Sequence, residues 1–243
     1  MREKDYLKKT GSLLSKIIPT GLPLPILCGP LSKSLWITGA LAGKSKGLSI
    51  LFNRYEPHQM ARARETITPN DICFDIGANV GIYSLLFAQN AQHVFSFEPL
   101  PRNIVYLYGT LKLNRIKNAT IVPFAVAENI KLTCFQEGED WGVGKITADG
   151  NQPAVTISCD EFAKKYNVVP TFMKIDVEGA ELDVLHGAEE LLSLHKTSLM
   201  LSVHGENLRT NCLTYLKSIG YNNVEPIDNS NVKNAHDYLI KAG

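Results

Sequence analysis

The most informative stretch of this sequence is Ile72-Cys73-Phe74-Asp75-Ile76-Gly77-Ala78-Asn79-Val80-Gly81, which a second apolar run follows. A short apolar run that ends in small, turn-forming residues is typical of a buried strand, and the apolar residues after the turn begin a helix. We therefore expect a strand over 72–76, a tight turn, and a helix over 81–90.

The turn has the features of a ligand-binding loop. Gly77 and Gly81 allow the backbone to turn sharply and to approach a ligand closely, and Asn79 tolerates a left-handed φ better than most residues. Asp75, which we place at the strand end, can accept hydrogen bonds from an amine or a hydroxyl group. Backbone N–H groups at the start of the helix favour an anionic group of the ligand.

A second acid follows at the distance expected for a nucleotide site. Glu98 ends a predicted strand over 93–98 and lies 23 residues after Asp75. In nucleotide-binding α/β folds, an acid about 20 residues on accepts hydrogen bonds from ribose hydroxyls. The dinucleotide fingerprint would also need glycine at positions 79 and 82, where the chain has Asn79 and Ile82. The spacing of residues 75–81 instead resembles the S-adenosylmethionine (SAM) loop of Rossmann-like methyltransferases.

Four motifs narrow this resemblance. They are Tyr55-Glu56-Pro57, the loop at 75–81, Phe97-Glu98-Pro99-x-Pro101-x-Asn103, and Lys174-Ile175-Asp176-Val177-Glu178-Gly179-Ala180-Glu181. Together they resemble the FkbM-type methyltransferases over roughly residues 50–205, and the last motif is the most specific. The resemblance implies that the cofactor S-adenosyl-L-methionine is bound by Glu56, Asp75, Gly77, Ala78, Asn79, Gly81, Ser84, Glu98, Pro99, Asn103, Ala125 and Asp176. It also implies O-methylation of a hydroxyl group on a sugar, a glycan or another small molecule.

The rest of the chain predicts the fold around these motifs. The expected strands are 72–76, 93–98, 119–126, 172–176, 198–204, 221–227 and 238–241, and the expected helices are 58–66, 81–90, 101–114, 160–166, 179–194 and 207–218. This alternation indicates a parallel sheet. We expect an α/β fold with a Rossmann-like, seven-stranded methyltransferase sheet, mostly parallel with an antiparallel last strand. In the helix over 101–114, we expect Ile104, Tyr108 and Leu111 to share one face.

We expect one methyltransferase domain over 55–243, with a small β insertion at 131–158. Residues 1–54 are expected to form an N-terminal extension, with a helix over 4–18 and a short hairpin between 24–28 and 34–38. The insertion contains a long polar loop with Trp141, for which lining the acceptor pocket and packing are equal alternatives.

The predicted parallel strands end in polar residues where such sheets bind ligands. These are Asp75, Glu98, Asp176 and His204. Methyl transfer from a sulfonium needs an aligned acceptor and removal of the hydroxyl proton. We expect Asp176 and His204 to orient and deprotonate that hydroxyl, with His204 as the base because the unperturbed pKa of histidine lies near neutrality. Glu178 is the reserve candidate. Structural roles for Asp176, paired with Lys174, and for His204 are the alternatives.

Several other sites and partners are disfavoured. The net charge of +1 provides no strong field for nucleic acid. Asp176 is not followed by the Pro-Pro-Tyr/Phe motif of many amino methyltransferases. Asp176, Glu178 and His204 could supply part of a metal site, but no loop repeats acids, and we predict no metal.

The cysteines and the apolar runs bear on the compartment. The five cysteines have no close pair, which is typical of reduced thiols in a cytoplasmic protein. No apolar run reaches the ~18 residues of a membrane helix, although a weak contact of the basic, apolar N-terminus with a membrane surface is an alternative. The sequence therefore predicts a cytoplasmic SAM-dependent O-methyltransferase. The alternatives are a SAM-binding protein without turnover and a nucleotide-sugar or NAD-linked Rossmann enzyme.

Overall fold

The computed structural model describes residues 18–41, 47–137, 144–147, 150–195, 197–228 and 231–242. The strands of its central sheet are β3 (Ile72–Ile76), β4 (His93–Phe97), β5 (Ala119–Val122), β10 (Phe172–Ile175), β11 (Ser198–Ser202), β12 (Asn223–Pro226) and β13 (Asp237–Lys241). Their order is β12-β13-β11-β10-β3-β4-β5. β13 is antiparallel to both of its neighbours, whereas the other neighbouring strands are parallel. The predicted seven-stranded, mostly parallel sheet is confirmed.

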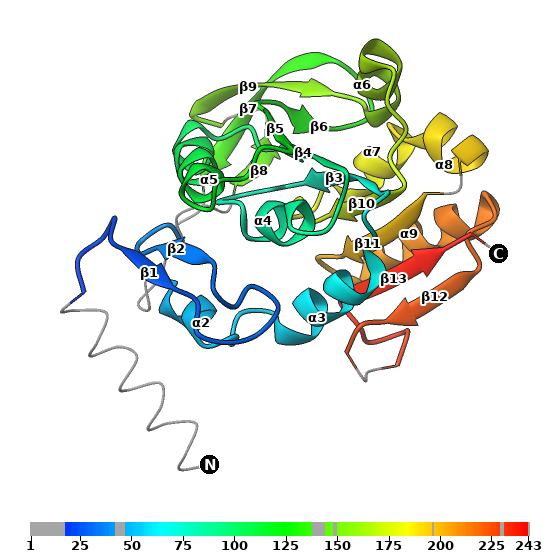
Figure 1. Ribbon diagram of the computed structural model, residues 1–243. Helices are drawn as coiled ribbons and strands as arrows, with labels where there is room; N and C mark the ends of the chain where they lie inside the picture. Colours follow the sequence, from blue (N-terminus) through cyan, green and yellow to red (C-terminus); the bar gives the residue numbers. More distant parts are fainter. Residues whose placement is uncertain are drawn as a thin grey trace.

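Helices pack on both faces of this sheet (Figure 1). They are α2 (Leu48–Leu51), α3 (Pro57–Thr66), α4 (Ile82–Ala88), α5 (Pro101–Leu113), α6 (Cys159–Tyr166), α7 (Glu181–His186), α8 (Glu189–His195) and α9 (Glu206–Ser218). Successive strand residues point to opposite faces, so each apolar strand supplies two cores. Phe74 and Phe97 pack with α6 to α9 on one face, whereas Cys73 and Val94 pack with α2, α3 and α4 on the other.

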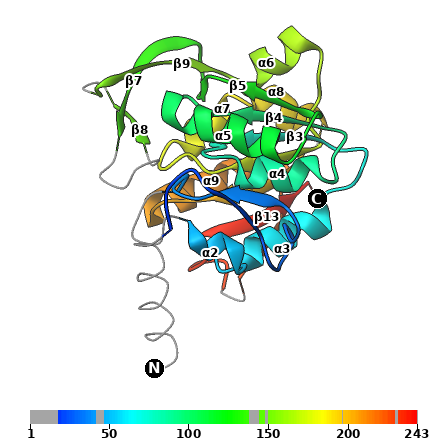
Figure 2. The same cartoon turned by 60° about the vertical axis from the view of Figure 1, so that its left-hand side comes forward.

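The predicted strand over 119–126 is wrong, because the chain divides there between two sheets. β5 ends at Val122, and Pro123, which has no N–H group to donate, cannot continue the ladder. The next strand is β6 (Ala125–Val126), which joins β7 (Lys131–Glu137), β8 (Gly144–Thr147) and β9 (Gln152–Ile157) in a sheet of order β6-β9-β7-β8. Figure 2 shows β7, β8 and β9 to one side of the central sheet. Trp141 lies outside the described residues.

The predicted helix over 179–194 is two helices, α7 and α8. The chain breaks at Gly187, whose carbonyl accepts a hydrogen bond from the N–H of Asp160. The Asp160 carboxylate accepts hydrogen bonds from the N–H groups of Glu190 and Leu191, both at 3.0 Å. Asp160 therefore satisfies the first N–H groups of α8 as a cap from another helix.

The predicted apolar face of α5 is confirmed at Leu111 and wrong at Tyr108. The buried residues of this helix are Asn103, Leu107, Thr110 and Leu111, whereas Tyr108 is 57% exposed. The two polar members are hydrogen-bonded: Asn103 donates to Glu98, and the Thr110 hydroxyl donates to the carbonyl of Val80. Satisfied polar groups can therefore occupy a buried helix face.

The N-terminal segment forms the predicted hairpin, with β1 (Pro23–Pro25) antiparallel to β2 (Leu35–Ile37). Trp36 of β2 is fully buried in the core beside α4. The Asn114 side chain bonds the backbone N–H and carbonyl of Leu35 at 2.7 and 2.8 Å, which fixes the hairpin to the end of α5. The predicted helix over 4–18 lies outside the described residues up to residue 17, and the domain division at residue 54 stays a prediction.

None of the helices in the described ranges has the length and apolar character needed to cross a membrane.

Candidate active site

A cavity of about 570 Å³ lies at the carboxyl ends of β3, β4, β10 and β11. This volume is in the range of small-molecule sites. Ten of the predicted site residues line it: Glu56, Gly77, Ala78, Asn79, Glu98, Pro99, Ala125, Asp176, Glu178 and His204. Four others, Asp75, Gly81, Ser84 and Asn103, are described but are not among its lining residues.

The glycine loop is held by the strand beside it. The N–H groups of Gly77 and Ala78 both donate to the carbonyl of Phe97, at 3.1 and 2.9 Å. Gly77 has a φ of 79°, and a Cβ atom there would lie 1.9 Å from the carbonyl oxygen of Asp176. Asn79 has the left-handed φ, 49°, that its residue type tolerates. Gly77 is therefore required by its contact with the backbone of Asp176, before any ligand is considered.

Glu98 is buried at the tip of β4 and shapes the loop. Its carboxylate accepts hydrogen bonds from the N–H of Asn79 at 2.8 Å, the N–H of Leu100 at 3.0 Å and the side-chain amide of Asn103 at 3.2 Å. Burial raises the pKa of Glu98 to about 7, although these hydrogen bonds oppose the shift. Asn103 thus contacts Glu98 and not the cavity.

Asp75 and Ser84 are buried and do not line the cavity, and their predicted contact with the ligand stays a prediction. β3 continues one residue past Asp75, whose fully buried carboxylate accepts a hydrogen bond from the Ser84 hydroxyl at 2.6 Å. Gly81 also has a packing role, because a Cβ atom there would lie 2.5 Å from Cδ1 of Leu107 on α5. Asp75, Ser84 and Gly81 therefore pack behind the residues that line the cavity.

Lys174 is a cavity residue that the sequence predicted only as a partner of Asp176. It is 3% exposed, and its Nζ lies 3.1 Å from Oδ2 of Asp176 and 3.9 Å from Oδ1 of Asp75. Burial alone would lower the pKa of Lys174, but Asp176 and Asp75 hold it above its ordinary value. The Nζ also lies 4.8 Å from the ring centre of Tyr83. The spacing of residues 174 and 176 puts both side chains on one side of a strand. This spacing is the feature of the sequence that indicates their contact.

Tyr83 and Glu56 form a second polar pair in the wall, and Tyr83 was missed. The Tyr83 hydroxyl donates to Oε2 of Glu56 at 2.7 Å. Glu56 precedes α3 with a left-handed φ of 41°, and Pro57 then begins the helix. Burial raises the pKa of Glu56. A tyrosine in an apolar helix such as α4 carries no sequence signal for this contact.

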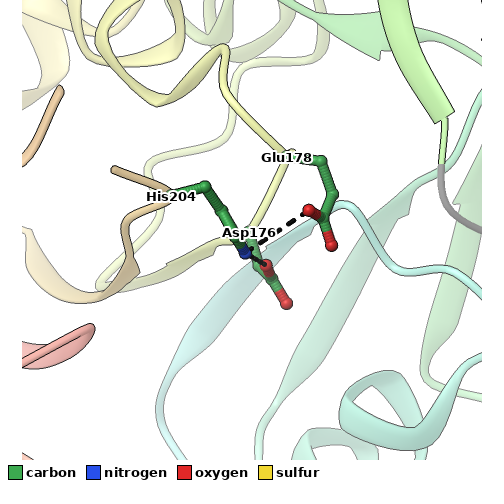
Figure 3. Close-up of side chains that lie close together, drawn as sticks. All are labelled: Asp176, Glu178 and His204. Atoms are coloured by element: carbon green, nitrogen blue, oxygen red, sulfur yellow. Dashed lines mark ion pairs between the residues drawn. The ribbon is translucent and has the colours of Figure 1, made fainter. Parts of the chain in front are cut away.

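Asp176, Glu178 and His204 converge at the ends of β10 and β11 (Figure 3). Nε2 of His204 lies 3.5 Å from Oε2 of Glu178 and 3.9 Å from Oδ1 of Asp176. Nδ1 of His204 lies 2.8 Å from Oε1 of Glu181, which is fully buried. Since β10 and β11 are parallel neighbours, the strand-end reasoning correctly brought Asp176 and His204 together.

The expectation of a near-neutral His204 is wrong. The hydrogen bond to Glu181 raises the pKa of His204 to about 9; burial opposes this shift, and Glu178 and Asp176 add to it. The imidazole is therefore charged at neutral pH in this arrangement, and a charged imidazole has no lone pair with which to accept a proton.

The cavity carries an excess of acids. Its described lining contains Glu56, Glu98, Asp176, Glu178 and Asp237, against Lys174 as its single lysine or arginine. Such a lining favours a ligand with positive charge.

Methyltransferases are among the known proteins similar to this chain. The model of the methyltransferase FkbM domain matches residues 75–223. The hexuronic acid methyltransferase AglP of Haloferax volcanii is 30% identical over 133 residues, which are 53% of this chain and 54% of that protein. The chain thus aligns with about half the length of this curated relative.

Two solved structures share the fold. The methyltransferase FkbM from Methylobacillus flagellatus superposes with a TM-score of 0.55 and 21% identity, covering 72% of this chain and 44% of that one. The precorrin-6y C5,15-methyltransferase from Geobacter metallireducens superposes with a TM-score of 0.50 and 13% identity, covering 77% of this chain and 88% of that one.

Proposed function

Because this chain belongs to the FkbM methyltransferase family, we propose that it transfers the methyl group of SAM to a hydroxyl group of a sugar or a related small molecule. The observation that carries this proposal is the placement of Glu98 and of the Asp176, Glu178 and His204 side chains in one cavity. Glu98 suits the ribose of SAM, and the other three side chains suit a reacting hydroxyl.

The residues of the cavity fit SAM in charge and in shape. SAM supplies an activated methyl group on a positively charged sulfur, which suits a described lining whose five acids outnumber Lys174 and the charged His204. Glu98 faces the cavity, and a carboxylate can accept more hydrogen bonds than the three it receives from the protein. Gly77 and Ala78 leave room beside it because they have little or no side chain.

The reacting end of the cavity is the group of Asp176, Glu178 and His204. The acceptor oxygen forms a bond to the methyl carbon as the carbon–sulfur bond breaks, and sulfur keeps the electron pair. The hydroxyl proton passes to the carboxylate of Glu178 and then to water, while Asp176 orients the hydroxyl. Positioning supplies most of the acceleration, and a base adds roughly 10²–10⁴-fold. Glu178 replaces His204 as the preferred base, because the imidazole is charged at neutral pH.

A second group of polar side chains supports a sugar as the acceptor. Asp237 accepts hydrogen bonds from the Ser202 hydroxyl at 2.6 Å and from the Gln59 amide at 2.8 Å, and all three side chains line the cavity. Such a wall provides donors and acceptors for several hydroxyl groups. The relative AglP is named a hexuronic acid methyltransferase, which supports the same acceptor class.

Ligand-dependent unfolding, combined with a transfer assay, tests this proposal. SAM at 100 times its Kd should raise the free energy of unfolding by about 2.7 kcal/mol, and NAD should not. Labelled SAM should then transfer its methyl group to a member of a panel of sugars and uronic acids. A shift with NAD alone would refute the proposal. SAM binding without transfer to any acceptor would favour a SAM-binding protein without turnover.

A replacement at the reacting end separates binding from chemistry. Glu178→Gln should keep the stabilisation by SAM and lower kcat by at least about tenfold, because the amide cannot accept the proton. A variant with full turnover would contradict the role of Glu178 as the base.

A further inference from the structure

We propose that Asp176, Glu178 and His204 bind a divalent metal ion, and that this ion chelates two neighbouring oxygens of the acceptor. The inference rests on the proposed function and deepens it, because it names the acceptor class as a vicinal diol or a hydroxy acid. The sequence predicted no metal because no loop repeats acids, whereas in the structure the candidate ligands follow the ends of two strands.

The distances of Asp176 and Glu178 from His204 suit ligands of one ion. One ligand atom from each side chain lies within 4.8 Å of the other two. The separations from Nε2 of His204, 3.5 and 3.9 Å, are longer than normal hydrogen bonds. Ligands at about 2.0–2.2 Å from a metal lie about 3–4 Å from one another. Figure 3 shows the three side chains pointing toward the same small volume.

An independent observation concerns Glu181, a residue outside this set. Its carboxylate is 0% exposed and lies 2.8 Å from Nδ1 of His204, while the N–H of Gly179 donates to it at 3.1 Å. A metal ion would displace the proton from Nε2, and a carboxylate on Nδ1 keeps the remaining proton on that nitrogen and leaves the lone pair on Nε2. Histidine ligands of metals commonly have this partner, which orients the ring and strengthens the ligand.

The protein also holds one oxygen of Asp176 and leaves the other available to a ligand. Lys174 holds Oδ2 of Asp176 at 3.1 Å, whereas Oδ1 is the atom nearest to His204. A buried ammonium group on one oxygen fixes the carboxylate and leaves the other oxygen for a ligand. Both His204 and Asp176 therefore present one atom to the shared volume while the protein holds the other.

The charge of the cavity explains why a metal ion would help an anionic acceptor such as a uronic acid to bind. A uronic acid is an anion, and the acids of the described lining outnumber its single lysine. A divalent cation between Asp176 and Glu178 would offset this repulsion. Two carboxylates and one imidazole favour an ion such as Mn²⁺, which accepts both oxygen and nitrogen ligands and keeps further positions open.

The transfer step remains balanced with the ion in place. The acceptor oxygen forms its bond to the methyl carbon, the carbon–sulfur bond breaks, and sulfur keeps the electron pair. A cation on the hydroxyl oxygen would lower the pKa of that hydroxyl, so that its proton could pass to water at the cavity mouth. The step would then need no histidine as a base.

Binding of Mn²⁺ to the full chain tests this site without any turnover. Protein freed of metals with a chelator is titrated with Mn²⁺, and the free ion is followed by electron paramagnetic resonance. We expect one saturable site per chain. Glu178→Gln and His204→Ala should each weaken binding more than about tenfold, and Glu181→Gln by about 10–100-fold, as for other partners of ligating histidines.

The matched control is Glu206→Gln, which makes the same change two residues from His204 in a side chain that is 85% exposed. It should bind Mn²⁺ as the unmodified protein does. The stabilisation of each variant by SAM, measured with chelator present, shows that the variant is folded. Absence of saturable Mn²⁺ binding, or equal binding by Glu178→Gln and Glu206→Gln, would overturn the metal site. The shift with SAM would meanwhile test the proposed function separately.

Discussion

Replacing Glu98 with glutamine keeps the size of the side chain and changes its hydrogen-bonding groups. The Glu98 carboxylate receives three hydrogen bonds, from Asn79, Leu100 and Asn103. In the variant, the amide oxygen can still accept from Leu100 and Asn103, but the amide NH₂ then meets the N–H of Asn79. The change therefore costs one hydrogen bond and leaves no acceptor for ribose hydroxyls.

The effect on stability depends on pH. The folded pKa of Glu98, about 7, is raised above its ordinary value of 4.5, so the folded state holds a proton that the unfolded state releases. The associated stability is complete below pH 4.5 and is lost as the pH rises through 7, by roughly 3 kcal/mol. Glu98→Gln escapes this loss but leaves an unpaired N–H, which costs about 1–3 kcal/mol. At pH 8 the free energy of unfolding of the variant should thus lie within about 2 kcal/mol of that of the unmodified protein.

The effect on SAM binding should be large at the same pH. A hydrogen bond to a charged group contributes about 1.5–3 kcal/mol, so that affinity should fall roughly 10- to 100-fold at pH 8. At pH 6 Glu98 is mostly protonated, and the difference between the two proteins should shrink. The charge of the buried Asp75 also helps to raise the pKa of Glu98. Asp75 is present in both the unmodified protein and the variant.

Calorimetric titration with SAM at pH 6 and pH 8, together with urea unfolding, checks these numbers. The decisive quantity is the ratio of the SAM affinity of the unmodified protein to that of Glu98→Gln, measured at each pH. Equal affinities at pH 8 would show that Glu98 does not contact the ribose. An equal loss at both pH values would show that its ionisation has no part in binding.

Two further replacements test the support of the cavity. Gly77→Ala should destabilise the fold by roughly 1–2 kcal/mol through its positive φ alone, and more through the contact with the Asp176 carbonyl, with loss of SAM binding; an unchanged thermal midpoint and SAM affinity would contradict this. Lys174→Met should lower the free energy of unfolding in urea by about 3–5 kcal/mol at pH 7, because Asp75 and Asp176 lose their buried cation; a loss under about 1 kcal/mol would refute that pairing.

The sequence predicted the strands well where they are short, apolar and bounded by turns. β3 and β10 match their predicted ranges within one residue, because both are buried on two faces. The error at 119–126 came from reading through Pro123, which is the residue that ends the ladder. The error in the helix over 179–194 came from Asp160, a cap that is distant in sequence.

The candidate site was predictable to the extent that it depends on strand ends. That reasoning brought Glu98, Asp176 and His204 to one cavity. Asp75 is not among the lining residues, because it lies one residue before the end of β3, where its carboxylate accepts a hydrogen bond from Ser84 in the core. The pKa of His204 could not be predicted, since its shift depends on the buried Glu181 of another element.

The division of the chain after Val122 has a consequence for how such an enzyme can change. Phe124, Ala125 and Val126, which leave the central sheet, and Phe135 of β7 all line the cavity. One wall is therefore built by the small sheet, whereas Glu98, Asp176 and His204 stand on the central one. Substitutions in the small sheet can widen or narrow the cavity without moving a single charged group. The shape of this wall and the charged groups can thus be altered independently, one sheet at a time.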